Sequence, residues 1–183
     1  SLATVRRVPN EPGMAAKVFT MLAEAGVNVD MIVQASASTG TADISFTVPG
    51  TAAAKVQEVL QEKQDELGYQ SFDVDANVGK VAVVGVGMKT HSGLAAKFFN
   101  ALSDEGVNVL MISTSEIRIA ALVPLGQLND AVRALHTAYG LDSDQVEAVV
   151  YGGTWPLNRV AAFGLFGSYE VGFAHDSRKP TFL

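Results

Sequence analysis

The strongest candidate for binding chemistry in this chain is a turn that leads into a helix, at residues 10–15, NEPGMA. The first backbone N–H groups of a helix have no acceptor within the helix, and the helix dipole adds partial positive charge there. Such an end can hold a carboxylate. Gly13 lets the backbone approach a bound group closely. We therefore predict that Asn10, Gly13 and Ala15 bind the carboxylate of a small ligand.

Two polar residues further along the chain can complete such a site. Asp30 and Gln34 alternate with apolar residues in VNVDMIVQ, residues 27–34, which predicts a strand with one polar face. The Asp30 carboxylate can accept hydrogen bonds from an ammonium group, and the Gln34 amide on the same face can bond another part of a ligand. Together these groups suit an amino acid. The alternative is that Asp30 and Gln34 are solvated strand residues.

The segment that carries these residues occurs twice. Residues 13–32, GMAAKVFTMLAEAGVNVDMI, recur at an offset of 80 as residues 93–112, GLAAKFFNALSDEGVNVLMI, with 12 of 20 positions identical. A period of this length suits a small domain rather than a solenoid repeat. The counterpart of Asp30 is Leu110, which cannot accept a hydrogen bond from an ammonium. We predict two domains of one fold with unequal binding surfaces, and one good type of site per chain.

Hydrophobic periodicity predicts the same order of elements in both copies. The first copy predicts strand 4–8, helix 14–25, strand 27–33, strand 43–48, helix 51–67 and strand 71–74. The second predicts strand 80–86, helix 93–104, strand 107–113, strand 116–123, helix 128–139 and strand 147–151. The order βαββαβ with a central hairpin indicates two tandem ferredoxin-like α+β domains, each with its helices on one face of the sheet.

These elements place the predicted domains at residues 1–76 and 77–153. Each sheet has free edge strands, so we expect a homodimer in which the sheets pair with those of a second chain. Residues 154–183 are rich in glycine and aromatic residues and differ from the rest of the chain. They are either a frame-shifted or vector-derived extension or a tail that forms a strand, which the alternation in 168–173 permits.

Composition argues against several classes of function. The chain has 183 residues, 48% of them hydrophobic, with no cysteine, three scattered histidines and a formal net charge of −6. No metal site, cofactor or nucleic-acid partner is expected, because thiolates, histidine ligand spacing and a basic cluster are all missing. No nucleophile, base and orienting group converge, so we expect no catalytic residue. The apolar runs are shorter than the roughly 20 residues that span a bilayer, and the first residues show no signal-peptide pattern. We expect no membrane partner and a cytoplasmic location.

Four segments resemble the regulatory region of aspartate kinase (aspartokinase), which carries tandem ACT domains. They are PGMAAKVF, GVNVDMIVQ, GKVAVVGVGMKTHSG and GVNVLMISTSEIRI. The resemblance covers about residues 8–153 and does not include the kinase's KFGGTS-type motif or its nucleotide-binding domain. It implies a regulatory (beta) subunit or region, which does not itself phosphorylate aspartate and which partners an aspartate kinase catalytic subunit.

The resemblance also implies an effector site between ACT domains. In this family effectors bind between an ACT domain and its neighbour, which brings Asn108 and Val109 of the second copy to the first site. Ser115 and Glu116 match the family's STSE segment near the opposite site. The implied effector is lysine or threonine, bound for feedback control of aspartate-family amino-acid biosynthesis.

The two effectors make different demands on the site. Lysine needs an anion for its second ammonium, for which Glu116 and Glu11 are candidates. Threonine needs only hydroxyl partners. Asn10 stands where the family usually has an acid, which removes one negative charge from the site. An alternative function is a ligand-independent module that dimerises and stabilises the kinase by pairing of sheet edges.

Overall fold

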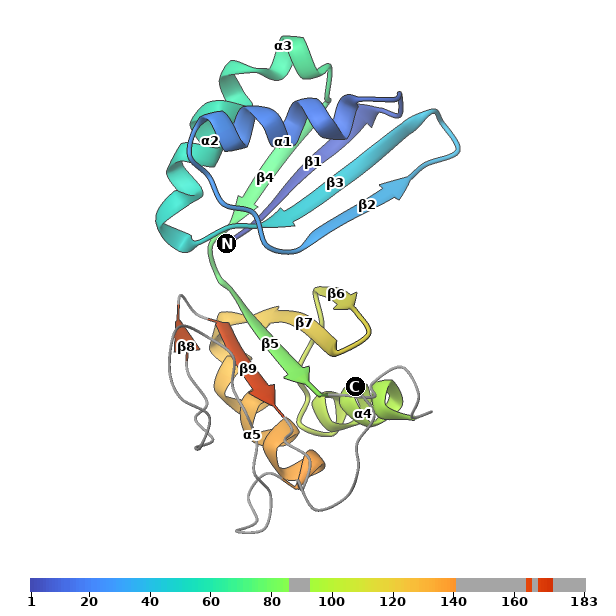
Figure 1. The fold of residues 1–183 in the computed structure, drawn as a ribbon, viewed down its shortest axis with the longest axis vertical. Coiled ribbons are helices and arrows are strands. Elements are labelled where there is room, and N and C mark those ends of the chain that lie inside the picture. The colour runs from blue at the N-terminus through green and yellow to red at the C-terminus, as the bar shows by residue number, and fades with distance from the viewer. Residues whose placement is uncertain (86–92, 141–163, 166–167, 173–183) are drawn as a thin grey trace, which may run out of the picture. The chain divides into compact units, whose positions relative to one another are not determined.

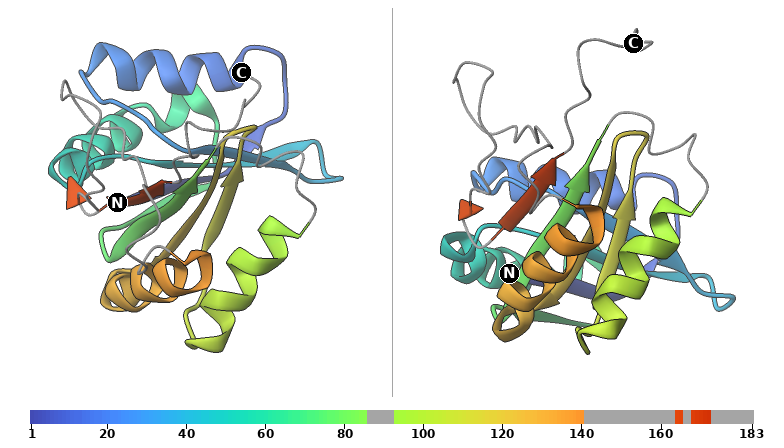
Figure 2. Two further views of the ribbon diagram at one scale, coloured as in Figure 1. Left: turned by 60° about the horizontal axis from the view of Figure 1, so that its bottom comes forward. Right: turned by 90° about the horizontal axis from the view of Figure 1, so that it is seen from below.

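The computed structural model describes residues 1–85, 93–140, 164–165 and 168–172, the last two by their backbone. The chain divides into two compact units, unit 1 (Ser1–Asn77) and unit 2 (Val78–Leu183). In each unit the helices cover one face of a sheet, as Figures 1 and 2 show. The predicted α+β class with ferredoxin-like elements is confirmed in both units.

Unit 1 is an antiparallel sheet with strand order β2-β3-β1-β4. Its elements are β1 (Leu2–Pro9), α1 (Met14–Glu24), β2 (Ile32–Ser36), β3 (Thr41–Thr47), the 3₁₀ turn η1 (Gly50–Ala52), α2 (Ala53–Glu62), α3 (Gln64–Leu67) and β4 (Ser71–Asp75). The predicted helix 51–67 is therefore three short pieces, and the order βαββαβ is otherwise as expected.

Helix α1 shows how local sequence sets an element. It begins after Gly13, whose φ of 92° lies in the left-handed region that glycine adopts without strain. Met14, Val18 and Leu22 follow at intervals of four, so they share the face that packs on the sheet. The Val27 N–H donates to the Leu22 carbonyl at 2.9 Å and closes the helix.

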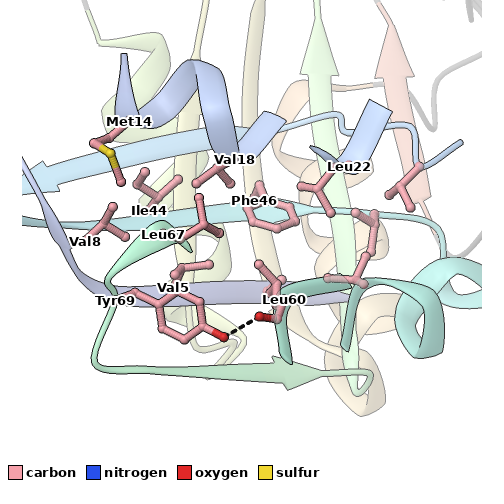
Figure 3. Packing of buried hydrophobic residues seen from close by; sticks show 14 residues of the cluster. Val5, Val8, Met14, Val18, Leu22, Ile44, Phe46, Leu60, Leu67 and Tyr69 are labelled. Atoms are coloured by element: carbon pink, nitrogen blue, oxygen red, sulfur yellow. Dashed lines mark hydrogen bonds between the residues drawn. The ribbon is translucent and has the colours of Figure 1, made fainter. Parts of the chain in front are cut away.

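The core of unit 1 lies between α1, α2, α3 and the sheet (Figure 3). Phe46 of β3 is fully buried, and the Phe19 ring packs edge-on against it with centroids 5.6 Å apart. Burial of each such side chain contributes roughly 1.5–3 kcal/mol. The buried Tyr69 hydroxyl donates to the Leu60 carbonyl at 2.6 Å, which satisfies the one polar group that this ring brings into the core.

The predicted strand 27–33 differs from the structure. Strand β2 begins only at Ile32, because the Met31 N–H donates to the Thr47 side-chain hydroxyl (3.0 Å) and the Asp30 N–H to the Thr47 carbonyl (3.0 Å). Regular pairing is interrupted at that point. Val27 and Met31 are still buried, which explains why the apolar alternation resembled that of a strand.

Unit 2 has strand order β6-β7-β5-β9-β8. Its elements are β5 (Val78–Val84), α4 (Leu94–Asp104), β6 (Met111–Thr114), β7 (Arg118–Pro124), the 3₁₀ turn η2 (Leu125–Gln127), α5 (Leu128–Tyr139), β8 (Gly164–Leu165) and β9 (Ser168–Gly172). Strand β9 runs parallel to β5, whereas the other pairs are antiparallel. The segment 168–173 thus contains a strand, and the predicted strand 147–151 lies outside the described residues.

Helix α5 packs closely on the sheet of unit 2 at a glycine. A Cβ atom at Gly79 of β5 would lie 2.6 Å from a methyl carbon of Leu128, which no side chain can accept without movement. The hydroxyl of Tyr139, at the other end of α5, donates to the Leu94 carbonyl at 2.8 Å and ties α5 to α4. None of the helices in the described residues is long and apolar enough to span a bilayer.

Candidate functional site

The predicted carboxylate site lies at the start of α1. Its turn is held by three backbone hydrogen bonds, from Asn10 to the Gly40 carbonyl (3.0 Å), from Glu11 to the Pro9 carbonyl (3.0 Å) and from Met14 to the Glu11 carbonyl (3.2 Å). Within the described part of the chain, the N–H groups of Gly13 and Ala15 have no hydrogen-bond acceptor. The turn is exposed, and these donors can therefore hold an anionic oxygen from solution.

Asp30 lies at the other end of the sheet from this turn. Its N–H contacts Thr47 at the last residue of β3, whereas Asn10 contacts Gly40, just before β3 begins. At roughly 3.3 Å per residue, the six steps from Thr41 to Thr47 amount to about 20 Å. Within unit 1 the structure therefore separates the carboxylate donors from Asp30, and one amino acid cannot reach both.

Gln34 lies between these two ends. It pairs with Ile44 on β3, so the two residues share a face of the sheet. Ile44 packs beside Met14 and Val18 of α1 (Figure 3), which places Gln34 on the helix-covered face. Because β2 is the edge strand, the Gln34 side chain remains exposed, and it can contact a ligand or a partner at this edge.

Asp30 and Leu110 occupy the same backbone position in the two units. The Asp30 N–H donates to the Thr47 carbonyl at 3.0 Å, and the Leu110 N–H donates to the Leu122 carbonyl at 2.8 Å. Leu110 nevertheless leaves 42% of its surface exposed. The scaffold is thus equal in the two copies, and only unit 1 presents a carboxylate there.

The loop of unit 2 that carries Asn108 is held by a side chain that sequence analysis did not single out. Gln127 accepts the Asn108 N–H at 3.0 Å and donates to the Gly106 carbonyl at 3.1 Å. The Asn108 N–H is therefore occupied, while its side chain is exposed, and Val109 packs on the core of unit 2. Ala52, the last residue of the matching 3₁₀ turn, cannot form this clamp in unit 1.

Ser115 and Glu116 lie in the turn between β6 and β7. The Ser115 N–H donates to the Arg118 carbonyl at 2.7 Å, and the Ser115 hydroxyl accepts the Ile117 N–H at 3.4 Å. These contacts shape a short turn with an exposed Glu116. No group of three potential metal ligands occurs in the described ranges.

Comparison with known proteins identifies both units. Two models of the ACT domain match residues 3–68 and 81–139. The aspartokinase of Corynebacterium efficiens is 45% identical over 153 residues, which are 82% of this chain and 36% of that protein. A crystal structure of aspartokinase alpha and beta subunits contains a chain that is 44% identical, with a TM-score of 0.70 over 76% of this chain and 91% of that one. This chain belongs to the aspartokinase family.

Its match lies in the regulatory part of that family. The regulatory subunit of aspartate kinase from Thermus thermophilus, in its ligand-free form, is 36% identical with a TM-score of 0.70, over 75% of this chain and 91% of that chain. This chain spans about a third of the length of the curated aspartokinases that it matches, 36% for the relative from Mycolicibacterium smegmatis. Its described residues form ACT domains and include no kinase domain. The resemblance predicted from the sequence is confirmed.

One signal in the sequence could have revealed Gln127. If the two copies are aligned on Pro49 and Pro124, which each precede a 3₁₀ turn, Gln127 falls opposite Ala52. A polar residue against an alanine at the same turn indicates a contact that only one copy makes. The GVNV segments themselves, which match in both copies, carry no such signal.

Proposed function

We propose that this chain is the feedback-regulatory part of an aspartokinase and binds lysine or threonine between ACT domains. The N–H donors of Gly13 and Ala15 suit the carboxylate of an amino acid, and the exposed Asp30 suits its ammonium. The separation of these groups within unit 1 is the observation that carries the proposal. An amino acid bound to the N–H donors or to Asp30 needs its remaining contacts from another ACT domain. Binding therefore favours the state in which the two domains are associated.

This arrangement explains how an amino acid could control a kinase. An effector shifts an equilibrium only by its different affinity for the two states, with a coupling free energy of typically about 1–3 kcal/mol. A ligand held between domains of two chains stabilises the homodimer in one geometry. The regulatory dimer then acts on the aspartokinase catalytic subunit in the cytoplasm, and Asn108, Val109, Ser115 and Glu116 supply contacts from the second domain.

Isothermal titration calorimetry of the 183-residue chain tests the proposal. We expect L-threonine or L-lysine to release or absorb heat saturably at millimolar concentration and to raise the melting temperature. D-threonine and D-lysine are the matched controls, because they carry the same charges with the opposite geometry. If none of the four amino acids binds saturably, the sensor function is excluded.

A specific observation favours a second candidate, the ligand-independent assembly module. Strand β6 is an edge of its sheet, and its neighbourhood exposes Leu110 (42%) and Ile112 (47%). Apolar residues at a free edge favour pairing with another strand. This function predicts a dimer whose dissociation constant is the same with and without lysine and threonine, which sedimentation equilibrium measures directly.

A further inference from the structure

Unit 1 has a polar hollow at the point where β1 leaves regular pairing. It has a volume of about 740 Å³ and is lined by Arg6 and Arg7, by the β2–β3 hairpin and by Gln70 and Ser71. Small-molecule sites usually measure about 300–1,000 Å³. The hydroxyl-bearing residues of the lining are Ser36, Thr39, Thr41 and Ser71.

The backbone is unusual where it brings two arginines to this hollow. Pairing of β1 with β3 shifts by one residue between Val5 and Val8, so β1 contains a bulge. Arg7 in the bulge has a φ of 55°, and it is the one non-glycine residue with a positive φ among those described. The Arg7 N–H donates to Asp43 Oδ1 at 2.8 Å and holds this conformation. Strained residues of this kind gather at functional sites, and bulges redirect side chains.

In the second copy the matching strand β5 stays in register with β7 from Val78 to Val84 and has no bulge there. Gly85 is the counterpart of Arg7, because each stands two residues after a valine, Val83 or Val5, that pairs with an isoleucine of the neighbouring strand. Glycine adopts a positive φ without strain, whereas arginine does not. A glycine at position 7 would therefore adopt this φ with less strain than Arg7, and what Arg7 adds is a guanidinium group in the hollow.

The charges around the hollow leave this guanidinium available. Arg6 donates from Nε (3.1 Å) and Nη2 (2.8 Å) to one oxygen of Asp73. The carboxylate of Asp43 accepts the Arg7 N–H. In the described ranges no acceptor contacts the Arg7 guanidinium itself. A planar fork of N–H donors beside several hydroxyls matches the oxygens of a carboxylate or a phosphate.

We propose that this hollow binds an oxyanion, the carboxylate or phosphate group of a small molecule, with Arg7 as the main contact. The anion's other hydrogen-bond donors are the hydroxyls of Ser36 and Ser71 and the remaining N–H groups of Arg6. The site is independent of the proposed effector function, because it uses neither the N–H groups of the α1 turn nor Asp30.

Titration of the full chain with succinate and with inorganic phosphate, at ionic strength held constant with sodium chloride, tests this site. We expect saturable binding of at least one anion by calorimetry. Arg7→Gly should raise its dissociation constant about tenfold or more, as loss of a charge-assisted hydrogen bond does. The same variant should melt no lower than the original chain, because glycine suits the φ at this position.

Two further variants make the result specific. Arg7→Lys keeps the charge and loses the fork, so we expect an intermediate dissociation constant. Arg133→Ala removes the same charge from the exposed surface of α5 and should leave binding unchanged. Saturable binding of only succinate or only phosphate supports the site and shows whether it takes a carboxylate or a phosphate group. If neither anion binds saturably, or if Arg7→Gly and Arg133→Ala weaken binding equally, the proposal is overturned.

Discussion

Units 1 and 2 share an arrangement of three antiparallel strands and two main helices, and they differ at several side chains outside the core. Helices α1 and α4 each follow a glycine with a φ near 90°, 92° for Gly13 and 95° for Gly93. Leu22 and Leu102 are both fully buried at matching positions. Other positions differ, with Asp30 against Leu110, Gln127 against Ala52, and the exposed Arg7 against the buried Gly85.

This comparison indicates that the two copies keep residues that determine the fold and vary at positions outside the core. A buried leucine or a glycine at positive φ cannot change without a large cost in stability. An exposed residue at an edge strand or a turn can change at little cost. The positions that distinguish the units are therefore the ones at which we expect each ACT domain to make contacts of its own.

The largest effects on stability should come from the matched core residues. Leu22→Ala and Leu102→Ala each remove a fully buried side chain, and each should lower the free energy of unfolding by about 2–5 kcal/mol. Chemical denaturation measures both. Thr20→Ala and Asn100→Ala, at exposed and equivalent helix positions, are controls that should change stability by less than about 0.5 kcal/mol. A small loss for one leucine alone would show that the two cores are not equivalent.

The clamp of unit 2 should have a smaller effect. Gln127→Ala removes two hydrogen bonds at an exposed loop and should cost about 1 kcal/mol of stability. Hydrogen exchange of the Asn108 amide should become faster, because its acceptor is lost. The reverse change, Ala52→Gln, tests whether unit 1 can take the same clamp and should slow exchange of the Asn28 amide. Unchanged exchange at Asn108 in Gln127→Ala would contradict the role of the clamp.

The smallest effect concerns pH. Burial raises the pKa of Tyr139 to about 12, whereas the unfolded chain titrates near the ordinary value of about 10. The unfolded state therefore loses this proton first, so stability is fully present below pH 10 and decreases as pH rises from 10 towards 12.

Tyr139→Phe tests this pH dependence. The variant should be less stable at pH 8, because the hydrogen bond to the Leu94 carbonyl is lost, and should have a flatter stability profile above pH 10. Burial also raises the pKa of Tyr69, so part of the slope should remain. If the stabilities of Tyr139→Phe and of the original chain change in parallel from pH 8 to pH 12, Tyr139 does not cause the pH dependence. Thermal unfolding at a series of pH values gives the comparison.

Local patterns predicted most of the fold. Helix α5 was predicted at 128–139 and spans Leu128–Tyr139, because an apolar stripe and a final glycine are both local signals. The start of β2 could not be predicted in this way. The Met31 N–H donates to the side-chain hydroxyl of Thr47, 16 residues away, in place of a backbone carbonyl. Such a contact depends on the tertiary structure.

The separation within the candidate site has a similar cause. Hydrophobic alternation indicates which face of a strand a residue lies on, and it does not indicate which end of the sheet that residue reaches. Helix α1 runs back along the sheet, so its start and the segment before β2 lie at opposite ends. Asn10 and Asp30 therefore looked like neighbours in the sequence pattern. Arg7 was missed because its φ and its contact with Asp43 exist only in the folded chain.

Calorimetry on an exchanged pair of variants most directly tests whether unit 1 alone supplies the ammonium partner. Asp30→Leu gives unit 1 the residue of unit 2 and leaves a bound ammonium without its carboxylate, and a hydrogen bond to a charged group contributes roughly 1.5–3 kcal/mol. We expect the affinity for L-threonine or L-lysine to fall about tenfold or more. Leu110→Asp should leave the original affinity intact. Equal affinities in the original chain and in Asp30→Leu, or an equal loss in both variants, would contradict the assignment of Asp30.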